Sequence, residues 1–136
     1  MPGPPTPNLG LTVPTIGGDF NNWGAELNAD LAILDGLGAA TSYSPSVNFI
    51  VPFVAFPEVF VYATGGAGGI TVSLPAPATW KGKIVVIKKM DPALGAVIVT
   101  PAAGLVDGSP SYFLVNQNQY VRLHSDGVNA NVVGNN

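Results

Sequence analysis

The sequence contains no cysteine and few charged residues, and each of these shortages excludes a class of function. Without cysteine there is no disulfide, no thiol nucleophile and no cysteine-based zinc site. Charged residues make up 10% of the chain, against roughly 25% in an average soluble domain. Only 5 residues are Lys or Arg, too few for the cationic stripe that binds phosphate backbones, so we expect no nucleic-acid partner.

Segments that would direct the chain into a membrane are also missing. The first five residues, Met1 to Pro5, have neither a basic nor an apolar region, so we expect no signal peptide. The longest apolar stretch, residues 49–62, is interrupted by Pro52, Pro57 and Glu58 and is shorter than the about 20 residues that a spanning helix needs. We therefore expect no membrane partner.

Apolar residues, glycine and proline are abundant instead. Hydrophobic residues make up 47% of the 136 residues, and the chain contains 17 Gly and 13 Pro. A small domain buries a low share of its surface, so this chain has more apolar side chains than it can cover alone. We expect the surplus to lie in contacts with other chains.

The first of three segments, residues 1–18, is rich in proline and predicts an extended arm. Its apolar side chains nearly alternate with small polar ones, which indicates anchors laid against another protein rather than a flexible linker. The candidate anchors are Leu9, Leu11, Val13, Pro14 and Ile16. Packing of the arm on its own domain is the alternative.

The second segment, residues 19–38, predicts one short α-helix. Asp19, Asn21 and Asn22 offer N-caps, and Gly36 and Gly38 are expected to stop the helix. Leucine recurs at i, i+4 and i+7, which forms a narrow apolar stripe. Two interpretations stay open: a helical bundle around a trimer axis, or a helix lying on the β domain. The expected contacts are Trp23, Leu27, Leu31 and Leu34.

The third segment, residues 39–136, predicts a β domain. Short alternating or apolar runs are separated by Gly, Pro and Asp-Gly turns, without a βαβ rhythm. The fold class is therefore mainly β: a small antiparallel β-sandwich or barrel after an extended Pro-rich arm and one short α-helix. The expected strands are Val47–Val51, Glu58–Ala63, Ile70–Leu74, Lys83–Lys89, Ala96–Thr100, Tyr112–Val115, Gln119–Ser125 and Ala130–Val133. Residues 84–87 are apolar on both faces, which predicts a strand buried on both sides.

Residues with catalytic or metal-binding potential do not form a site. His124, Ser125 and Asp126 are consecutive, and neighbouring strand residues face opposite ways, so they cannot align as a triad. The glycine run at 65–69 precedes a strand and not a helix, which indicates a hairpin connection rather than a phosphate loop. Asp126, Asn129 and Asn131 carry oxygens at loop spacing, but no bidentate Glu completes a calcium site, so a turn explains them better.

Further candidates for chemistry are equally weak. Four of the five basic residues are Lys81, Lys83, Lys88 and Lys89, which we interpret as solvated strand ends or edge protection. No pair of carboxylates has catalytic spacing. We expect no enzyme, no cofactor and no metal, although a small hydrolase using His124 or Asp126 is the least favoured alternative.

Two stretches resemble proteins of tailed-bacteriophage appendages. The first is Asn8–Asp19 followed by Trp23-Gly24-Ala25-Glu26-Leu27-Asn28, a Leu/Pro arm before a short helix. The second is the set of β pieces at 70–75, 82–89, 106–109 and 123–127, which resemble small modules of head and tail fibres. Ala130-Asn131 stands where such modules often have Trp.

This resemblance implies a non-enzymatic virion structural protein on the surface of the phage particle: a homotrimeric fibre-like, capsid-decoration or adaptor module. Its partners would be copies of itself and a major capsid or tail protein, gripped by the N-terminal arm. The alternative is a carbohydrate- or receptor-binding module of a tail fibre, with Trp80, Tyr112 and Tyr120 as the platform for a ligand. Packing in the core or in an interface is the simpler explanation of these rings and of Tyr62.

Overall fold

The computed structural model describes residues 23–37, 41–52 and 58–136, and divides the chain into two units, Met1–Ala39 and Ala40–Asn136. In the first unit the described element is α1 (Trp23–Leu37), which agrees with the short helix expected within 19–38. Alanine and leucine, both strong helix formers, dominate this segment. Across the described ranges, no helix is both long enough and apolar enough to cross a lipid bilayer.

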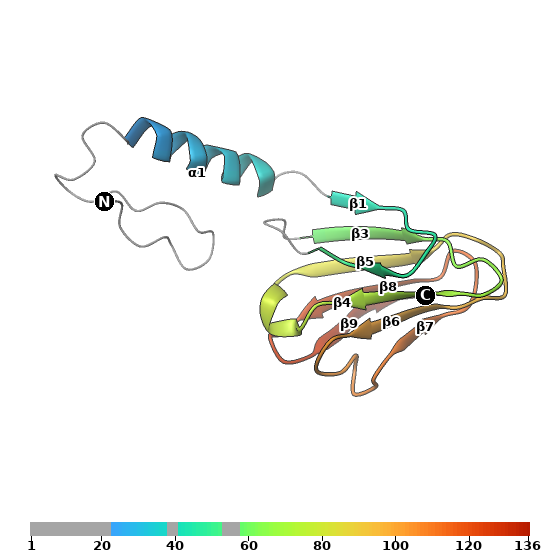
Figure 1. The fold of residues 1–136 in the computed structure, drawn as a ribbon. Coiled ribbons are helices and arrows are strands. Elements are labelled where there is room, and N and C mark those ends of the chain that lie inside the picture. Colours follow the sequence, from blue (N-terminus) through green and yellow to red (C-terminus); the bar gives the residue numbers. More distant parts are fainter. Residues whose placement is uncertain (1–22, 38–40, 53–57) are drawn as a thin grey trace. The chain divides into compact units, whose positions relative to one another are not determined.

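The second unit is a β-sandwich of nine strands within its described residues (Figure 1). Its two sheets have the strand orders β1-β3-β5-β8-β9 and β2-β4-β6-β7. The strands are β1 (Thr41–Tyr43), β2 (Phe49–Ile50), β3 (Glu58–Ala63), β4 (Ile70–Leu74), β5 (Ile84–Lys89), β6 (Val97–Pro101), β7 (Tyr112–Leu114), β8 (Tyr120–Ser125) and β9 (Ala130–Asn135). A short 3-10 helix, η1 (Pro77–Trp80), precedes β5.

The mainly β class is confirmed, but the antiparallel arrangement expected from the sequence is only partly right. From β1 to β6 the chain alternates between the sheets, so that β1, β3 and β5 pair in parallel and so do β2, β4 and β6. Antiparallel pairing appears only where β7, β8 and β9 are added. The sheets are mixed and open, so the barrel alternative is wrong.

The glycine run is a crossover between sheets, not the hairpin connection expected from the sequence. It joins β3 of one sheet to β4 of the other, and it packs against the loop that joins β5 to β6. The approach is so close that a Cβ on Gly95 would lie 2.1 Å from the backbone N of Gly69. Gly69 itself has φ +71°, which favours glycine.

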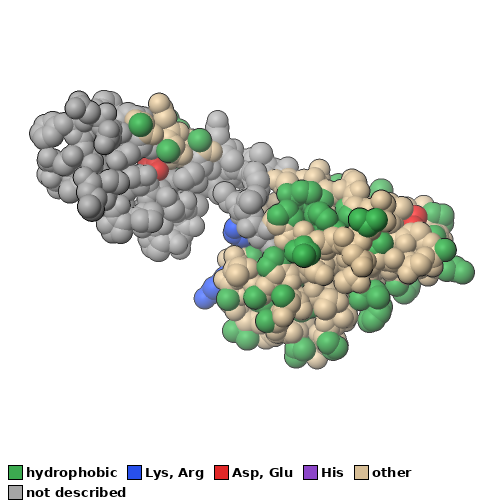
Figure 2. All heavy atoms as spheres, viewed as in Figure 1, with side chains coloured by type: hydrophobic (Ala, Val, Ile, Leu, Met, Phe, Trp, Pro, Cys, Tyr) green, Lys and Arg blue, Asp and Glu red, His purple; other side chains and the backbone are tan. Residues whose placement is uncertain are grey.

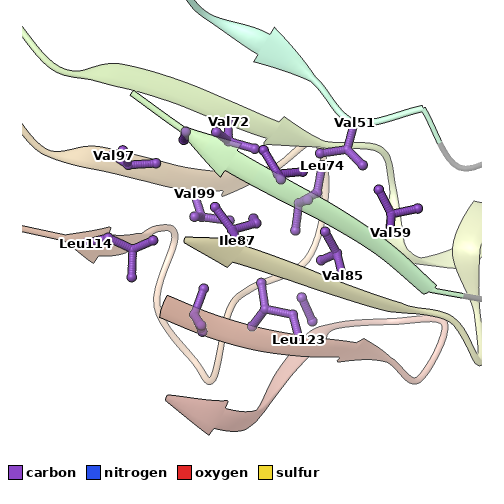
Figure 3. Close-up of a cluster of buried hydrophobic side chains, with 14 of the residues drawn as sticks. Val51, Val59, Val72, Leu74, Val85, Ile87, Val97, Val99, Leu114 and Leu123 are labelled. Atoms are coloured by element: carbon purple, nitrogen blue, oxygen red, sulfur yellow. The ribbon is translucent and has the colours of Figure 1, made fainter. Parts of the chain in front are cut away.

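The core lies between the sheets and is built mainly from alternate residues of β3, β4, β5, β6 and β8 (Figure 3). The strands with burial on every second residue place valine, isoleucine and leucine inward. Figure 3 labels side chains from both sheets: Val59, Val85, Ile87 and Leu123 from one, and Val72, Leu74, Val97, Val99 and Leu114 from the other.

Strand β5 differs from its expected environment. Val85 and Ile87 are fully buried, but Ile84 and Val86 lie on the outer face and are only half-buried. The strand is central in its sheet and has a covered face and an uncovered face. The expectation of a strand buried on both sides is therefore wrong for this single chain.

Candidate functional site

The candidate anchors of the N-terminal arm, Leu9, Leu11, Val13, Pro14 and Ile16, lie outside the described residues, as do the expected N-caps of the helix. Their role stays a prediction.

The leucine stripe of α1 is defined by Leu27, Leu31 and Leu34, whose side chains are 48%, 51% and 45% exposed. Their spacing places them on one side of the helix. Trp23 begins the helix, but its side chain lies outside the described part. An exposed stripe of this kind leaves a large apolar surface in contact with water, so it is a candidate contact between chains.

The aromatic platform, the alternative drawn from the sequence, does not form. Trp80 is fully buried, and its Nε1 donates a hydrogen bond to the carbonyl of Pro75 at 3.0 Å. Tyr112 packs against the core, and its hydroxyl accepts a hydrogen bond from Asn135 Nδ2 at 2.8 Å. Tyr120 belongs to the opposite sheet, on its outer face. Trp80 is thus a core residue and Tyr112 is partly buried against the core, in line with core packing as the simpler explanation of these rings.

A different set of rings lies on the outer face of the five-stranded sheet. Tyr62 pairs with Lys88 on the next strand, and Lys88 pairs with Tyr120 on the strand after that. We call these three residues the aromatic row, after the two tyrosines on either side of Lys88. The alternation within β3, β5 and β8 indicates which of these side chains face outward. It does not indicate that the three strands are neighbours in the sheet.

Each of the two neighbouring rows of this face combines apolar side chains with charged or titratable ones. Phe60, Val86 and Arg122 form the second row, and Glu58, Ile84 and His124 form the third. Arg122 reaches across the middle strand to Glu58, with 3.3 Å between Nη2 and Oε1. This pair is largely exposed and contributes little to stability.

The four-stranded sheet presents a nearly uncharged outer face. Its outward positions include Thr71, Ser73, Ile98, Thr100 and Phe113. Figure 2 shows one side of the β domain on which hydrophobic and uncharged side chains predominate and charged ones lie at the margins. Exposed apolar side chains on the unit's described residues are Val47, Ile50, Leu94, Phe113, Val115, Val128 and Val133, with Tyr62, Met90 and Leu105 less so.

The four clustered lysines do not all share one surface, because Lys89 is buried. Lys81 is exposed after η1, Lys83 precedes β5, and Lys88 faces outward from β5. Lys89 is fully buried, which contradicts the expectation of a solvated strand end. Its Nζ donates to the carbonyls of Asp91 and Ala93, both at 2.9 Å, and to the carboxylate of Asp91.

Asp91 completes this buried ion pair by tying two loops together. Its second carboxylate oxygen accepts the backbone N–H of Gly66, in the glycine run. The hydrogen bond from Lys89 lowers the pKa of Asp91 below its ordinary value, against the opposing effect of burial. The pair has a structural role, because the Lys89 ammonium and the Asp91 carboxylate form their hydrogen bonds with groups of the protein itself.

The consecutive residues His124, Ser125 and Asp126 point in different directions, as expected. His124 lies on the outer face, whereas Ser125 is buried and its Oγ donates to the carbonyl of Pro77 at 2.7 Å. Asp126 Oδ1 accepts the N–H groups of Val128 and Asn129, both at 2.7 Å. The N–H of Asn129, the side-chain amide of Asn131 and the N–H of Val128 lower the pKa of Asp126 to about 2. The carboxylate therefore closes a turn.

A shallow hollow of about 160 Å³ lies where the loop before β8 meets the end of β9. It is lined by four amide residues, Asn116, Gln117, Gln119 and Asn136, which we call the amide hollow. Among residues 23–37, 41–52 and 58–136, no group of three or more His, Asp or Glu side chains could hold a metal ion. The chemistry available in the hollow is hydrogen bonding by neutral amides.

No protein-family model, no curated protein sequence and no solved structure matches this chain.

Proposed function

We propose that this chain is a non-enzymatic structural protein of a tailed-bacteriophage virion: a homotrimeric fibre-like, decoration or adaptor module. Copies of the chain would associate through the leucine stripe, and the arm at residues 1–18 would attach the assembly to a capsid or tail protein. The phage assignment depends on the resemblance of the arm, the Trp-Gly-x-Glu-Leu-Asn segment and the β pieces to appendage proteins.

The observation that supports assembly best is the leucine stripe. Leu27, Leu31 and Leu34 are each about half exposed. Full burial of a fully exposed leucine side chain contributes about 1.5–3 kcal/mol, so covering the exposed half of each contributes about half of that. Three such residues on each of three helices provide the main stabilisation that a short bundle needs, because short helices are marginal in isolation.

The distribution of charge is also consistent with an assembly held by apolar contacts. All five basic residues lie in the β domain, whereas residues 1–39 carry only the acidic Asp19, Glu26, Asp30 and Asp35. No ion pair between helices of identical sequence is therefore available to a bundle. Its association would depend on the leucines and weaken little in high salt.

Attachment through the arm follows from its composition. Proline restricts the unbound chain, so ordering the arm on a partner costs less conformational entropy. Three arms on one trimer also raise the effective concentration for the second and third contacts. Weak individual docking by Leu9, Leu11, Val13, Pro14 and Ile16 would then give stable attachment.

The test is a comparison of the full chain with a variant that lacks residues 1–18. Both are mixed with phage particles assembled without the protein and are sedimented together. We expect the truncated protein to remain a folded trimer and to lose binding to particles. The same loss is expected when Leu9, Leu11, Val13 and Ile16 are replaced by alanine in the full chain. Decoration at full occupancy by either variant would refute attachment through the arm.

A further inference from the structure

Three of the four side chains of the amide hollow, those of Gln117, Gln119 and Asn136, are each held at one end by a hydrogen bond. Gln119 Oε1 accepts the N–H groups of Val115 at 2.7 Å and Asn116 at 3.1 Å. Asn136 Oδ1 accepts the N–H of Tyr120 at 2.9 Å. Gln117 Nε2 donates to the carbonyl of Met90 at 3.2 Å.

These hydrogen bonds fix which end of each amide faces outward. Because their oxygens are occupied by backbone N–H groups, Gln119 and Asn136 present their NH₂ groups as donors. Gln117 presents its oxygen as an acceptor. Within the part of the chain that the structure describes, no hydrogen bond to these outward groups is found, and Asn116 lines the hollow beside them. The hollow therefore holds oriented donors and an acceptor at little cost in side-chain entropy.

The aromatic row lies at the same end of the five-stranded sheet. Tyr120 follows Gln119 directly in the chain, and its backbone N–H donates to Asn136. Lys88 lies two residues before Met90, whose carbonyl accepts the hydrogen bond from Gln117. Adjacent strands are about 4.8 Å apart, so Tyr62 and Tyr120 lie about 10 Å apart across Lys88. That separation is comparable to the length of a disaccharide. Tyr62 is 38% exposed.

We propose that the amide hollow and the aromatic row together bind an oligosaccharide. Sugar hydroxyls both donate and accept hydrogen bonds, which matches the outward NH₂ groups and the outward oxygen of the hollow. The C–H faces of sugar rings pack on tyrosine, whose apolar ring and polar hydroxyl suit a half-wet surface. The hollow carries no charged side chain, which disfavours a small anion as its ligand. This proposal does not depend on the assembly or the origin of the chain.

The experiment uses variants that keep the fold of the hollow and remove its donors. Gln119→Glu and Asn136→Asp retain the oxygens that accept from Val115, Asn116 and Tyr120, but replace the NH₂ groups with oxygens. Asn48→Asp is the matched control. Asn48 Oδ1 likewise accepts a backbone N–H, that of Thr71 at 2.9 Å. Asn48 precedes β2, which is the edge strand of the four-stranded sheet farthest from β7 and the hollow's loop.

A second pair of variants tests the rings. Tyr62→Ala removes one end of the aromatic row, whereas Phe113→Ala removes an exposed ring from the outer face of the other sheet. The full-length protein and all five variants are applied to a microarray of neutral, amino and acidic oligosaccharides. The oligosaccharide that binds most strongly is then titrated into 15N-labelled protein, and the side-chain amide signals are followed.

We expect binding by the wild type, shifts in the amide signals of Gln119 and Asn136, and unchanged binding by Asn48→Asp and Phe113→Ala. Gln119→Glu, Asn136→Asp and Tyr62→Ala should each weaken binding about tenfold, the equivalent of one lost hydrogen bond or stacking contact. The proposal is overturned if no oligosaccharide binds or if these three variants bind as the wild type does. Amide shifts that change with protein concentration alone would assign the surface to a second copy and overturn it as well.

Discussion

At the scale of single residues, Lys89 is the strongest departure from what its neighbourhood in the sequence indicates. It ends a strand beside another lysine, yet its side chain is fully buried. The ammonium has three donors, and the carbonyls of Asp91 and Ala93 with the carboxylate of Asp91 provide three acceptors. A buried ammonium with all its donors bonded stabilises the loops that supply the acceptors.

We expect Lys89→Met to destabilise the fold by about 3 kcal/mol, because breaking a buried ion pair leaves the partner carboxylate and carbonyls without a donor. The measurement is urea unfolding followed by fluorescence of the protein. Lys88→Met is the control, since Lys88 faces outward from the same strand, and its effect should stay within about 0.5 kcal/mol. Equal stabilities for the two variants would contradict a structural role for the buried ion pair.

Single residues also show which predictions the sequence permits. The opposed directions of His124 and Ser125 follow from strand geometry, and they are confirmed. Core or interface packing was the simpler prediction for Trp80 and Tyr112, and Trp80 is fully buried while Tyr112 is partly buried against the core. The amide hollow was missed because its members come from a loop and from the last residue described.

At the scale of elements, strand positions could be predicted but strand pairing could not. The runs 58–63 and 70–74 were expected as strands, and β3 and β4 have these bounds. Alternation with a period of two is the same for parallel and antiparallel partners, so it carries no information about the crossover between sheets. β1 is only three residues long and was missed.

The close packing of the glycine run against the β5–β6 loop requires glycine at position 95. In Gly95→Ala, the new Cβ would lie 2.1 Å from Gly69 N and 2.3 Å from Gly66 O, both backbone atoms. The two loops must therefore separate, and we expect a loss of about 2 kcal/mol, as in overpacked sites. Thermal unfolding measures it.

Gly68→Ala is the matched control in the glycine run. Nothing lies within 4 Å of a Cβ at Gly68, so we expect it to be neutral or slightly stabilising through the unfolded chain. The close packing of the two loops would be refuted if Gly95→Ala unfolded at the same temperature as Gly68→Ala.

At the scale of the whole molecule, apolar surface remains uncovered on both units. The leucine stripe of α1 is exposed, and so are Ile50 and Phe113 on the β domain. With charged residues at 10% of the chain, few charges are available to keep a single copy apart from others. Association of copies is the simplest way to cover this surface, and the proposed trimer depends on it.

The most direct measurement is sedimentation equilibrium of the full chain at micromolar concentration. We predict a trimer for the wild type and a monomer with a folded β domain for Leu31→Asp, because a charge in the leucine stripe would be buried in the bundle. Leu94→Asp, which alters a side chain that is 97% exposed in a loop of the β domain, should remain a trimer. A wild-type chain that sediments as a stable, soluble monomer would contradict the account.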